Sequence, residues 1–218
     1  MSLTIPVCEM FESIQGEGRF AGRHAFFVRT AGCNLDCTWC DTPYSLRAED
    51  GEPQAVERVA EIVAASRARH LVVTGGEPLL HRQAIGALAD ALPKLAIEFE
   101  TNGTIAPTIE RAYYSVSPKP SSAGNDPERA VRMDVLREFL AYDAVFKFVV
   151  GDDNDWRDMM DAIERAGIPS ERVWVMPRGR QDAELRATAL SLMPRILDHK
   201  FNLSPRLHVW LWGDERGK

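Results

Sequence analysis

Several features that mark common protein classes are missing from this chain of 218 residues. Lys and Arg together number 26 against 32 Asp and Glu, which gives a net charge of −6. The chain therefore lacks the basic excess with which sequence-independent binders neutralise nucleic-acid phosphates, and we expect no direct nucleic-acid partner. No apolar run approaches the roughly 20 residues that span a bilayer, so we expect no membrane partner. The first residues, MSLTIPVCEMFESIQGEG, carry no basic leader, which predicts that there is no signal peptide.

Cysteine is also scarce, and its distribution is uneven. There are four cysteines, and Cys33, Cys37 and Cys40 fall within eight residues. This pattern does not resemble a secreted disulfide framework, and it favours metal binding or catalysis in a reducing cytoplasm. Hydrophobic residues at 45% and charged residues at 27% are ordinary for a folded protein, and the length predicts a single domain over 1–218.

Short apolar segments alternate with helical patterns along the chain, without repeats or low-complexity tracts. Six segments are rich in β-branched and aromatic residues and predict buried strands: 24–32, 70–76, 96–103, 113–119, 144–151 and 173–179. Amphipathic spacing predicts helices over 53–68, 82–94, 127–142, 155–167 and 182–197. This alternation predicts an α/β fold, a partial (β/α) barrel of about six parallel strands, because six are too few to close an eight-stranded barrel. Chemistry is then expected at the carboxyl ends of the strands, where the cysteines, TGGEP, ETNGT, SPKP and MPRG all fall.

Three clustered thiols suit a soft metal, either zinc or an iron–sulfur cluster. A structural zinc site needs four ligands, and neither His24 nor His70 has a ligand-like spacing with the cysteines. Cys8 stands alone in an apolar segment and is expected to be a small buried side chain. Three ligands on a four-iron cluster would leave one iron open to a small molecule, but the triplet alone leaves zinc as a competitor.

The spacing Cys-x-x-x-Cys-x-x-Cys, with Trp39 before the last cysteine, resembles the signature of the radical S-adenosylmethionine (SAM) superfamily. TGGEP at 74–78 is similar to the superfamily stretch whose backbone binds the methionine end of SAM. Gly75 and Gly76 permit close backbone approach, although a tight strand-to-helix turn would also explain them. The resemblance implies a 4Fe-4S cluster and SAM as cofactors, together with a reducing electron donor such as a flavodoxin.

Further stretches, FESIQGEG, FVRTAGC, CDT, ETNGT, SPKP and RLHVWLWGDERGK, resemble the 7-carboxy-7-deazaguanine synthase family over nearly the whole chain. This resemblance implies a lyase of the queuosine and 7-deazapurine pathway, which feeds tRNA modification. The reaction contracts 6-carboxy-5,6,7,8-tetrahydropterin to 7-carboxy-7-deazaguanine with loss of ammonia. A hydrogen would leave C6 of the pterin and later return to regenerate SAM. Magnesium would be a third cofactor, and exposed apolar surface left by a shortened barrel would favour a homodimer.

The resemblance also implies residue roles. Cys33, Cys37 and Cys40 would hold the cluster, and Thr42 would ligate magnesium beside the substrate carboxylate, unless it only caps the turn at Pro43. Residues implied at the SAM site are Trp39, Cys40, Asp41, Gly76, Glu100, Ser117, Pro118, Lys119, Met176, Pro177, Arg178 and Gly179.

Substrate binding is implied for Ile14, Gln15, Gly16, Glu17, Arg29, Thr74 and His208. Of these, Arg29 and His208 would act with Thr42 as the catalytic set. Glu17 could equally be a loop carboxylate in water. Arg29 could instead pair with a structural acid, since an arginine on an apolar strand needs an anion of some kind. A lone histidine such as His208 is as often structural.

Two other functions remain open at this level. A glycyl-radical activating enzyme shares the cysteine triplet and the small barrel, but it would not be expected to combine QGEG, SPKP and LHVWLWG. A non-catalytic zinc or iron–sulfur protein would not need the Gly-Gly-Glu-Pro stretch.

Overall fold

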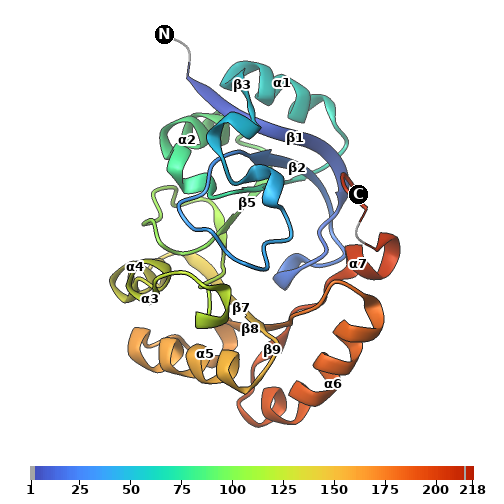
Figure 1. The fold of residues 1–218 in the computed structure, drawn as a ribbon. Helices are drawn as coiled ribbons and strands as arrows, with labels where there is room; N and C mark the ends of the chain where they lie inside the picture. Colours follow the sequence, from blue (N-terminus) through green and yellow to red (C-terminus); the bar gives the residue numbers. More distant parts are fainter. Residues whose placement is uncertain (1–2, 214) are drawn as a thin grey trace.

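The computed structural model describes residues 3–213 and 215–218, and in these residues nine strands form one curved sheet (Figure 1). The strand order is β3-β1-β2-β4-β5-β6-β7-β8-β9. From β2 onward each strand pairs in parallel with the next one in this order, whereas β1 is antiparallel to both β2 and β3. The strands are β1 (Thr4–Ile14), β2 (His24–Thr30), β3 (Glu52–Ala55), β4 (His70–Gly75), β5 (Ala96–Thr101), β6 (Tyr113–Val116), β7 (Asp143–Val150), β8 (Val173–Pro177) and β9 (Asn202–Leu203).

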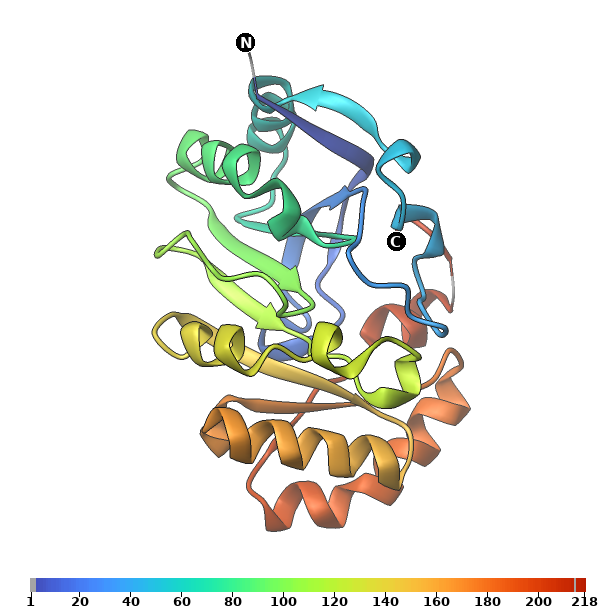
Figure 2. The same ribbon diagram turned by 60° about the vertical axis from the view of Figure 1, so that its left-hand side comes forward.

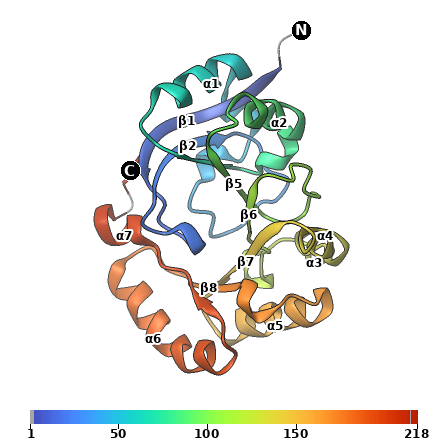
Figure 3. The same cartoon turned by 180° about the vertical axis from the view of Figure 1, so that it is seen from behind.

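Helices cover the outer face of this sheet and leave its inner face to the loops (Figures 1 and 3). The α-helices are α1 (Val56–Ala65), α2 (Arg82–Ala91), α3 (Pro127–Ala130), α4 (Met133–Phe139), α5 (Asp153–Ala166), α6 (Asp182–Asp198) and α7 (Leu207–Trp212). Short 3-10 helices are η1 (Gly18–Phe20), η2 (Pro43–Ser45), η3 (Ala48–Asp50), η4 (Pro78–His81), η5 (Ser121–Ala123) and η6 (Ser170–Arg172). In the part of the chain that the structure describes, no helix combines the length and the apolar character needed to cross a bilayer.

The two faces of the sheet differ in character because side chains alternate along each strand. In β7, Phe146 and Phe148 belong to the main hydrophobic core beneath the helices, whereas Lys147 between them lines the inner cavity. In β5, Phe99 likewise packs in the core and Glu100 lines the cavity. The helices therefore bury the apolar face, and the concave face is free to carry polar groups.

All six predicted strands are present, parallel and in chain order, which confirms the partial barrel. The sequence analysis did not identify β1, β3, β9 or α7. The predicted helix 53–68 begins only at Val56, because residues 53–55 pair with β1 as part of β3. The predicted helix 127–142 is two helices. The backbone is extended at Val131 and Arg132 between them, where Val131 packs against the core.

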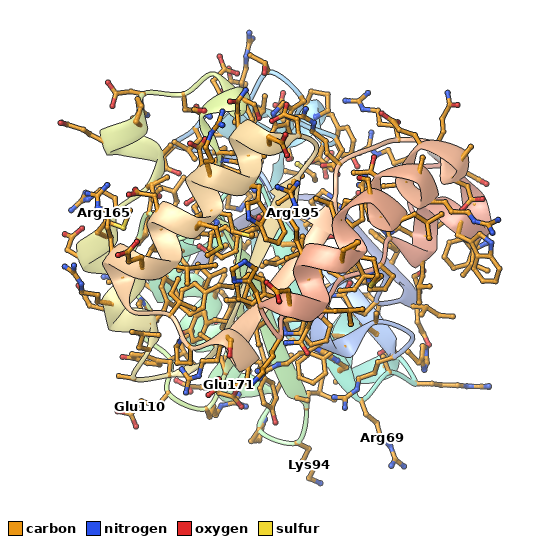
Figure 4. All side chains as sticks on the ribbon, turned by 90° about the horizontal axis from the view of Figure 1, so that it is seen from below. Arg69, Lys94, Glu110, Arg165, Glu171 and Arg195 are labelled. Carbon is orange, nitrogen blue, oxygen red and sulfur yellow. The ribbon has the colours of Figure 1, made fainter. Side chains whose placement is uncertain are left out.

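The two ends of the parallel strands have different surroundings. Arg69, Lys94, Glu110 and Glu171 precede β4, β5, β6 and β8. The side chains of Arg69, Lys94 and Glu110 point outward along one edge of the molecule (Figure 4). At the opposite, carboxyl ends, the loop after β2 approaches the C-terminal residues (Figure 2). Arg216 stacks there on the Tyr44 ring at 3.8 Å. Functional groups therefore gather at the end that the alternation of strands and helices predicts.

Candidate active site

A cavity of about 770 Å³ occupies the concave side of the sheet at the carboxyl ends of the strands. Every residue that the sequence analysis assigned to a site lines this cavity except Pro118, which is buried outside it. Pro118 could not have been told apart by sequence, because it lies between Ser117 and Lys119, which do line the cavity. Contact of Pro118 with a ligand stays a prediction.

The three clustered cysteines all line the cavity and are half-buried. Two of their sulfur atoms accept hydrogen bonds: Cys37 Sγ from Asn125 Nδ2 at 3.2 Å, and Cys33 Sγ from the Leu35 amide at 3.4 Å. Burial raises the pKa of the Cys33 and Cys37 thiols, so in the metal-free chain they stay protonated at neutral pH, and a bound metal would displace those protons.

The placement of these thiols bears on the choice between zinc and a cluster. Among residues 3–213 and 215–218, no three His, Cys, Asp or Glu side chains are placed around one point to hold a single metal ion. A four-iron cluster binds each thiolate through a different iron, so its ligands need only face a shared cavity. Trp39 Nε1 and Ser115 Oγ, both at the cavity wall, are buried without a hydrogen-bond partner in the described chain. The cavity fits a cluster with an organic ligand better than a mononuclear zinc ion.

The glycine pair after β4 has a structural cause. A Cβ on Gly76 would lie 2.1 Å from the Gly32 carbonyl oxygen, and one on Gly75 would lie 2.1 Å from that of Thr30. The Gly76 amide donates to Thr30 O at 3.0 Å, which fastens this turn to the start of the cysteine loop. The tight turn considered from sequence is therefore present, and Gly75 and Gly76 also remain on the cavity wall.

Thr42 lies on the cavity wall beside the last cysteine. Its carbonyl oxygen accepts hydrogen bonds from the amide and the hydroxyl of Ser45, the last residue of η2, whereas its side chain makes no capping hydrogen bond. Thr42 Oγ1 lies 3.8 Å from Cys40 Sγ. The Thr42 backbone therefore caps the turn at Pro43, as the sequence analysis considered. The Thr42 hydroxyl does not take part in this cap and can contact a ligand in the cavity.

Arg29 has the acidic partner that was considered as an alternative to a substrate carboxylate. Its Nε donates to Glu9 Oε1 at 2.7 Å, and the same oxygen accepts from Tyr44 Oη at 3.1 Å. Glu9 Oε2 accepts from Arg216 Nε at 2.8 Å, so burial, which would raise the pKa of Glu9, is outweighed and that pKa is lowered. Arg29 still lines the cavity beside Thr74, its partner in the β2–β4 register.

Gln15 connects two acidic side chains of β5. Its Nε2 donates to Glu98 Oε2 at 3.0 Å and to Glu100 Oε1 at 3.1 Å, and its Oε1 accepts from the Glu17 amide at 3.1 Å. Glu98 Oε2 also lies 3.3 Å from His70 Nε2, and both side chains are buried. His70 is therefore paired with an acid of the sheet. Both functional groups of the Gln15 amide are engaged, and the segment 14–17 is fixed against the sheet.

Glu17 is enclosed by cations rather than by water. Lys147 Nζ contacts Glu17 Oε2, and Arg206 Nε lies 3.1 Å from Glu17 Oε1. Burial would raise the pKa of Glu17, but these two charges outweigh it and hold that pKa well below the usual range. His208 Nε2 is 3.8 Å from the same carboxylate, and burial lowers the pKa of His208, which favours a neutral imidazole near pH 7. The suggestion of a solvated loop carboxylate was therefore wrong.

Side chains of the segments predicted to bind SAM make polar contacts within the protein. Lys119 Nζ donates to Ser117 Oγ at 3.0 Å. Arg178 Nη1 lies 3.0 Å from Asp155 Oδ2. The Arg178 amide donates to Val150 O at 2.9 Å and Gly179 O accepts from Arg206, so the backbone of 176–179 is held in place at the cavity wall. Arg180 donates to the Cys40 carbonyl at 2.9 Å.

Several cavity residues were missed by the sequence analysis, above all Lys147 and Arg206. Lys147 stands within an apolar strand, where its alternation with core residues was the available signal. Arg206 donates to Gly179 O at 2.7 Å and pairs with Asp41 Oδ2 at 2.6 Å, besides contacting Glu17. Nothing in the local sequence marks this role, because its partners come from three distant segments. Cys8 is half-buried, with weak contacts to backbone oxygens, and does not line the cavity.

Comparisons with known proteins agree with this arrangement. Residues 27–115 match the family model of the Radical SAM superfamily. A 7-carboxy-7-deazaguanine synthase of Pyrobaculum aerophilum is 39% identical over 223 residues, which cover 98% of this chain and 97% of the relative. The synthase of Hyperthermus butylicus is 36% identical over 225 residues, covering 96% and 93%. The crystal structure of QueE from Escherichia coli superimposes with a TM-score of 0.69 over 92% of this chain and 93% of that one; at 24% identity this shows a shared fold.

Proposed function

Because the chain belongs to the 7-carboxy-7-deazaguanine synthase family of radical SAM enzymes, we propose that it contracts the ring of 6-carboxy-5,6,7,8-tetrahydropterin to 7-carboxy-7-deazaguanine, with loss of ammonia. The observation that carries this proposal is the cavity in which three thiols, the glycine pair and the Gln15–Glu17 segment meet. Similarity to relatives over nearly the full chain supports the same reaction class.

Cofactors would be held at the cysteine loop. The 4Fe-4S cluster on Cys33, Cys37 and Cys40, with SAM on its open iron, supplies the organic radical when bound. Asn125 Nδ2 and the Leu35 amide would stabilise the thiolates by donating to sulfur, as they do to the thiols. Gly76 and the backbone of 176–179 would line the SAM subsite, and Ser117 and Lys119 would bind its polar groups.

Substrate would be oriented from the other wall of the cavity. Arg29, held by Glu9, would bind the pterin carboxylate through its remaining donors, and Thr42 would share that carboxylate through magnesium. Ile14, Gln15, Gly16 and Glu17 would meet the pterin edge, with His208 beside them. These residues act by holding one C–H bond toward the radical carbon, which is a contribution of positioning.

The test is anaerobic turnover by the reconstituted enzyme with SAM, dithionite, magnesium and the tetrahydropterin, with product followed by mass spectrometry. Thr42→Ala is expected to lower turnover and weaken its magnesium dependence, whereas Thr38→Ala in the same loop, which does not line the cavity, should leave both unchanged. Cleavage of SAM without pterin turnover by the wild-type enzyme would instead favour an activating enzyme for a protein partner. Zinc in place of iron would end the catalytic proposal.

Two partners complete the proposal. A flavodoxin-like donor would reduce the cluster, which the radical chemistry requires. We also propose a homodimer, supported by exposed apolar side chains on α6 and α7, among them Leu190, Leu197 and Trp210 at 64%, 69% and 65% exposure. A cysteine triplet that holds an iron–sulfur cluster suits a reducing compartment, and we propose a cytoplasmic location.

A further inference from the structure

Lys147 is a buried cation on the concave face of the sheet. Its side chain is only 6% exposed, and it lies on the cavity wall rather than among the core residues of β7. Placing an ammonium group in the interior is costly unless acids compensate for lost hydration. Lys147 Nζ contacts Glu17 Oε2 and lies 3.9 Å from Glu100 Oε1, so it stands between two carboxylates.

These carboxylates come from segments far apart in sequence. Glu17 follows β1 and Glu100 lies near the end of β5, and both line the cavity. Gln15 fixes both segments, since its Nε2 donates to Glu100 and its Oε1 accepts from the Glu17 amide. Two neighbouring carboxylates without a cation between them repel, and one then takes up a proton.

We propose that Lys147 is a positioning residue for substrate binding, which holds the Glu17 and Glu100 carboxylates on either side of its ammonium group so that they accept the N–H donors of the pterin pyrimidine edge. This edge carries a ring N–H and an exocyclic amino group next to each other, and ionised carboxylates are the acceptors that bind such donors most strongly. The inference rests on the proposed function, because it takes a pterin as the ligand of this wall.

The charges around Glu17 determine how its ionisation would respond to the loss of Lys147. Arg206 and His208 face Glu17 from the C-terminal segment, Glu100 of β5 lies 3.9 Å from the same Lys147 ammonium group, and Asp41 pairs with the far side of Arg206. Burial alone raises the pKa of Glu17, and Lys147 contributes the largest opposing charge, followed by Arg206. Without Lys147, the pKa of Glu17 rises, and binding of an N–H donor then weakens as the pH falls.

The experiment measures equilibrium binding of the tetrahydropterin to cluster-loaded, SAM-bound enzyme without reductant, so that no turnover occurs. Lys147→Met is expected to raise the Kd about 10- to 100-fold near neutral pH, the equivalent of one lost charge-assisted contact. The loss should grow as the pH is lowered from 8 to 5.5, whereas wild-type affinity changes less over that range. Lys147→Arg should recover part of the pterin affinity, because it restores a cation between the two carboxylates.

A second variant separates positioning from simple charge balance. Lys147→Met combined with Glu17→Gln removes both members of the pair and should restore thermal stability if Lys147→Met folds poorly. Under the proposal this double variant still binds the pterin at least as weakly as Glu17→Gln alone. Wild-type affinity in the double variant, or an unchanged Kd in Lys147→Met, would overturn the inference. Wild-type enzyme that does not bind the pterin at all would instead overturn the proposed function.

Discussion

Replacement of Gly76 by alanine tests whether the turn after β4 needs its glycines for packing, before any cofactor is bound. The new Cβ would lie 2.1 Å from the Gly32 carbonyl oxygen, 2.5 Å from the Gly32 carbonyl carbon and 2.7 Å from the Ser45 carbonyl oxygen. All three neighbours are backbone atoms, so no side chain can rotate away. Relief requires the cysteine loop and the end of β4 to separate.

Overpacking of this kind costs about 1–3 kcal/mol in a well-packed interior, and we expect the upper end because only backbone can move. For a chain of this size 1 kcal/mol corresponds to roughly 2–4 °C in Tm, so Gly76→Ala should lower Tm by about 6–12 °C. Gly86 in α2 offers a matched control, since a Cβ there meets only Ile109 Cδ1 at 4.0 Å. Gly86→Ala should stabilise the protein by about 0.5–1 kcal/mol, the usual gain in a helix interior.

The assay is thermal unfolding of the metal-free chain, followed by iron analysis after anaerobic reconstitution. Gly76→Ala should unfold early and retain less iron than wild type, because its effect begins at the cysteine loop. A metal-free Gly76→Ala protein with wild-type Tm would refute the packing argument and leave ligand contact as the reason for the glycine.

Three further outcomes follow from the ion pairs. The lowered pKa of Glu17 stabilises the folded protein fully at pH values above the ordinary glutamate pKa, and this stabilisation disappears as the pH falls through the folded-state pKa. Glu17→Gln should therefore reduce the free energy of unfolding at pH 7 by about 3 kcal/mol. In urea titrations, the free energy of unfolding of this variant should also decline less steeply below pH 5 than that of wild type. Asp155→Asn should release the Arg178 guanidinium and weaken SAM affinity measured by calorimetry, with unchanged affinity contradicting the role of 176–179. Glu9→Gln should loosen Arg216 and accelerate trypsin cleavage after it, whereas equal cleavage rates would show that this contact does not hold the C-terminal residues.

The strands were predicted correctly from the sequence because the residues on their outer faces are apolar along the whole strand. In β7 the run AVFKFVV is apolar apart from Lys147, so burial on a parallel sheet could be inferred from the letters alone. The direction of that lysine was also implicit in the alternation, yet its partners were not, since Glu17 lies 130 positions away. The local sequence pattern therefore predicts which face of the sheet a residue occupies. Its partners from distant segments can be identified only in the folded structure.

The residues of the candidate site likewise fall into two groups, those in local motifs and those whose contacts come from distant segments. Motifs such as Cys-x-x-x-Cys-x-x-Cys and TGGEP are local, and their resemblance to the radical SAM superfamily could be recognised in the sequence. Arg206 was not recognised, because its role depends on contacts with Glu17, Asp41 and the Gly179 carbonyl, which belong to three other segments. Pro118 was assigned together with its neighbours Ser117 and Lys119, and of the three only those two line the cavity.

The contact between the first and last parts of the chain has a consequence for biosynthesis. The Gly18 amide donates to Ser204 Oγ at 2.8 Å, and the Leu207 amide donates to the Gly16 carbonyl at 2.9 Å. Strands β5 to β9 can each pair with the strand made just before them as the ribosome adds residues. The segment around Glu17 must instead wait for residues 204–208, and contacts at such large sequence separation are the slowest kind to close. A nascent or truncated chain can thus complete its cysteine loop while its substrate wall is still open, and that wall closes only after residues 204–208 have been added.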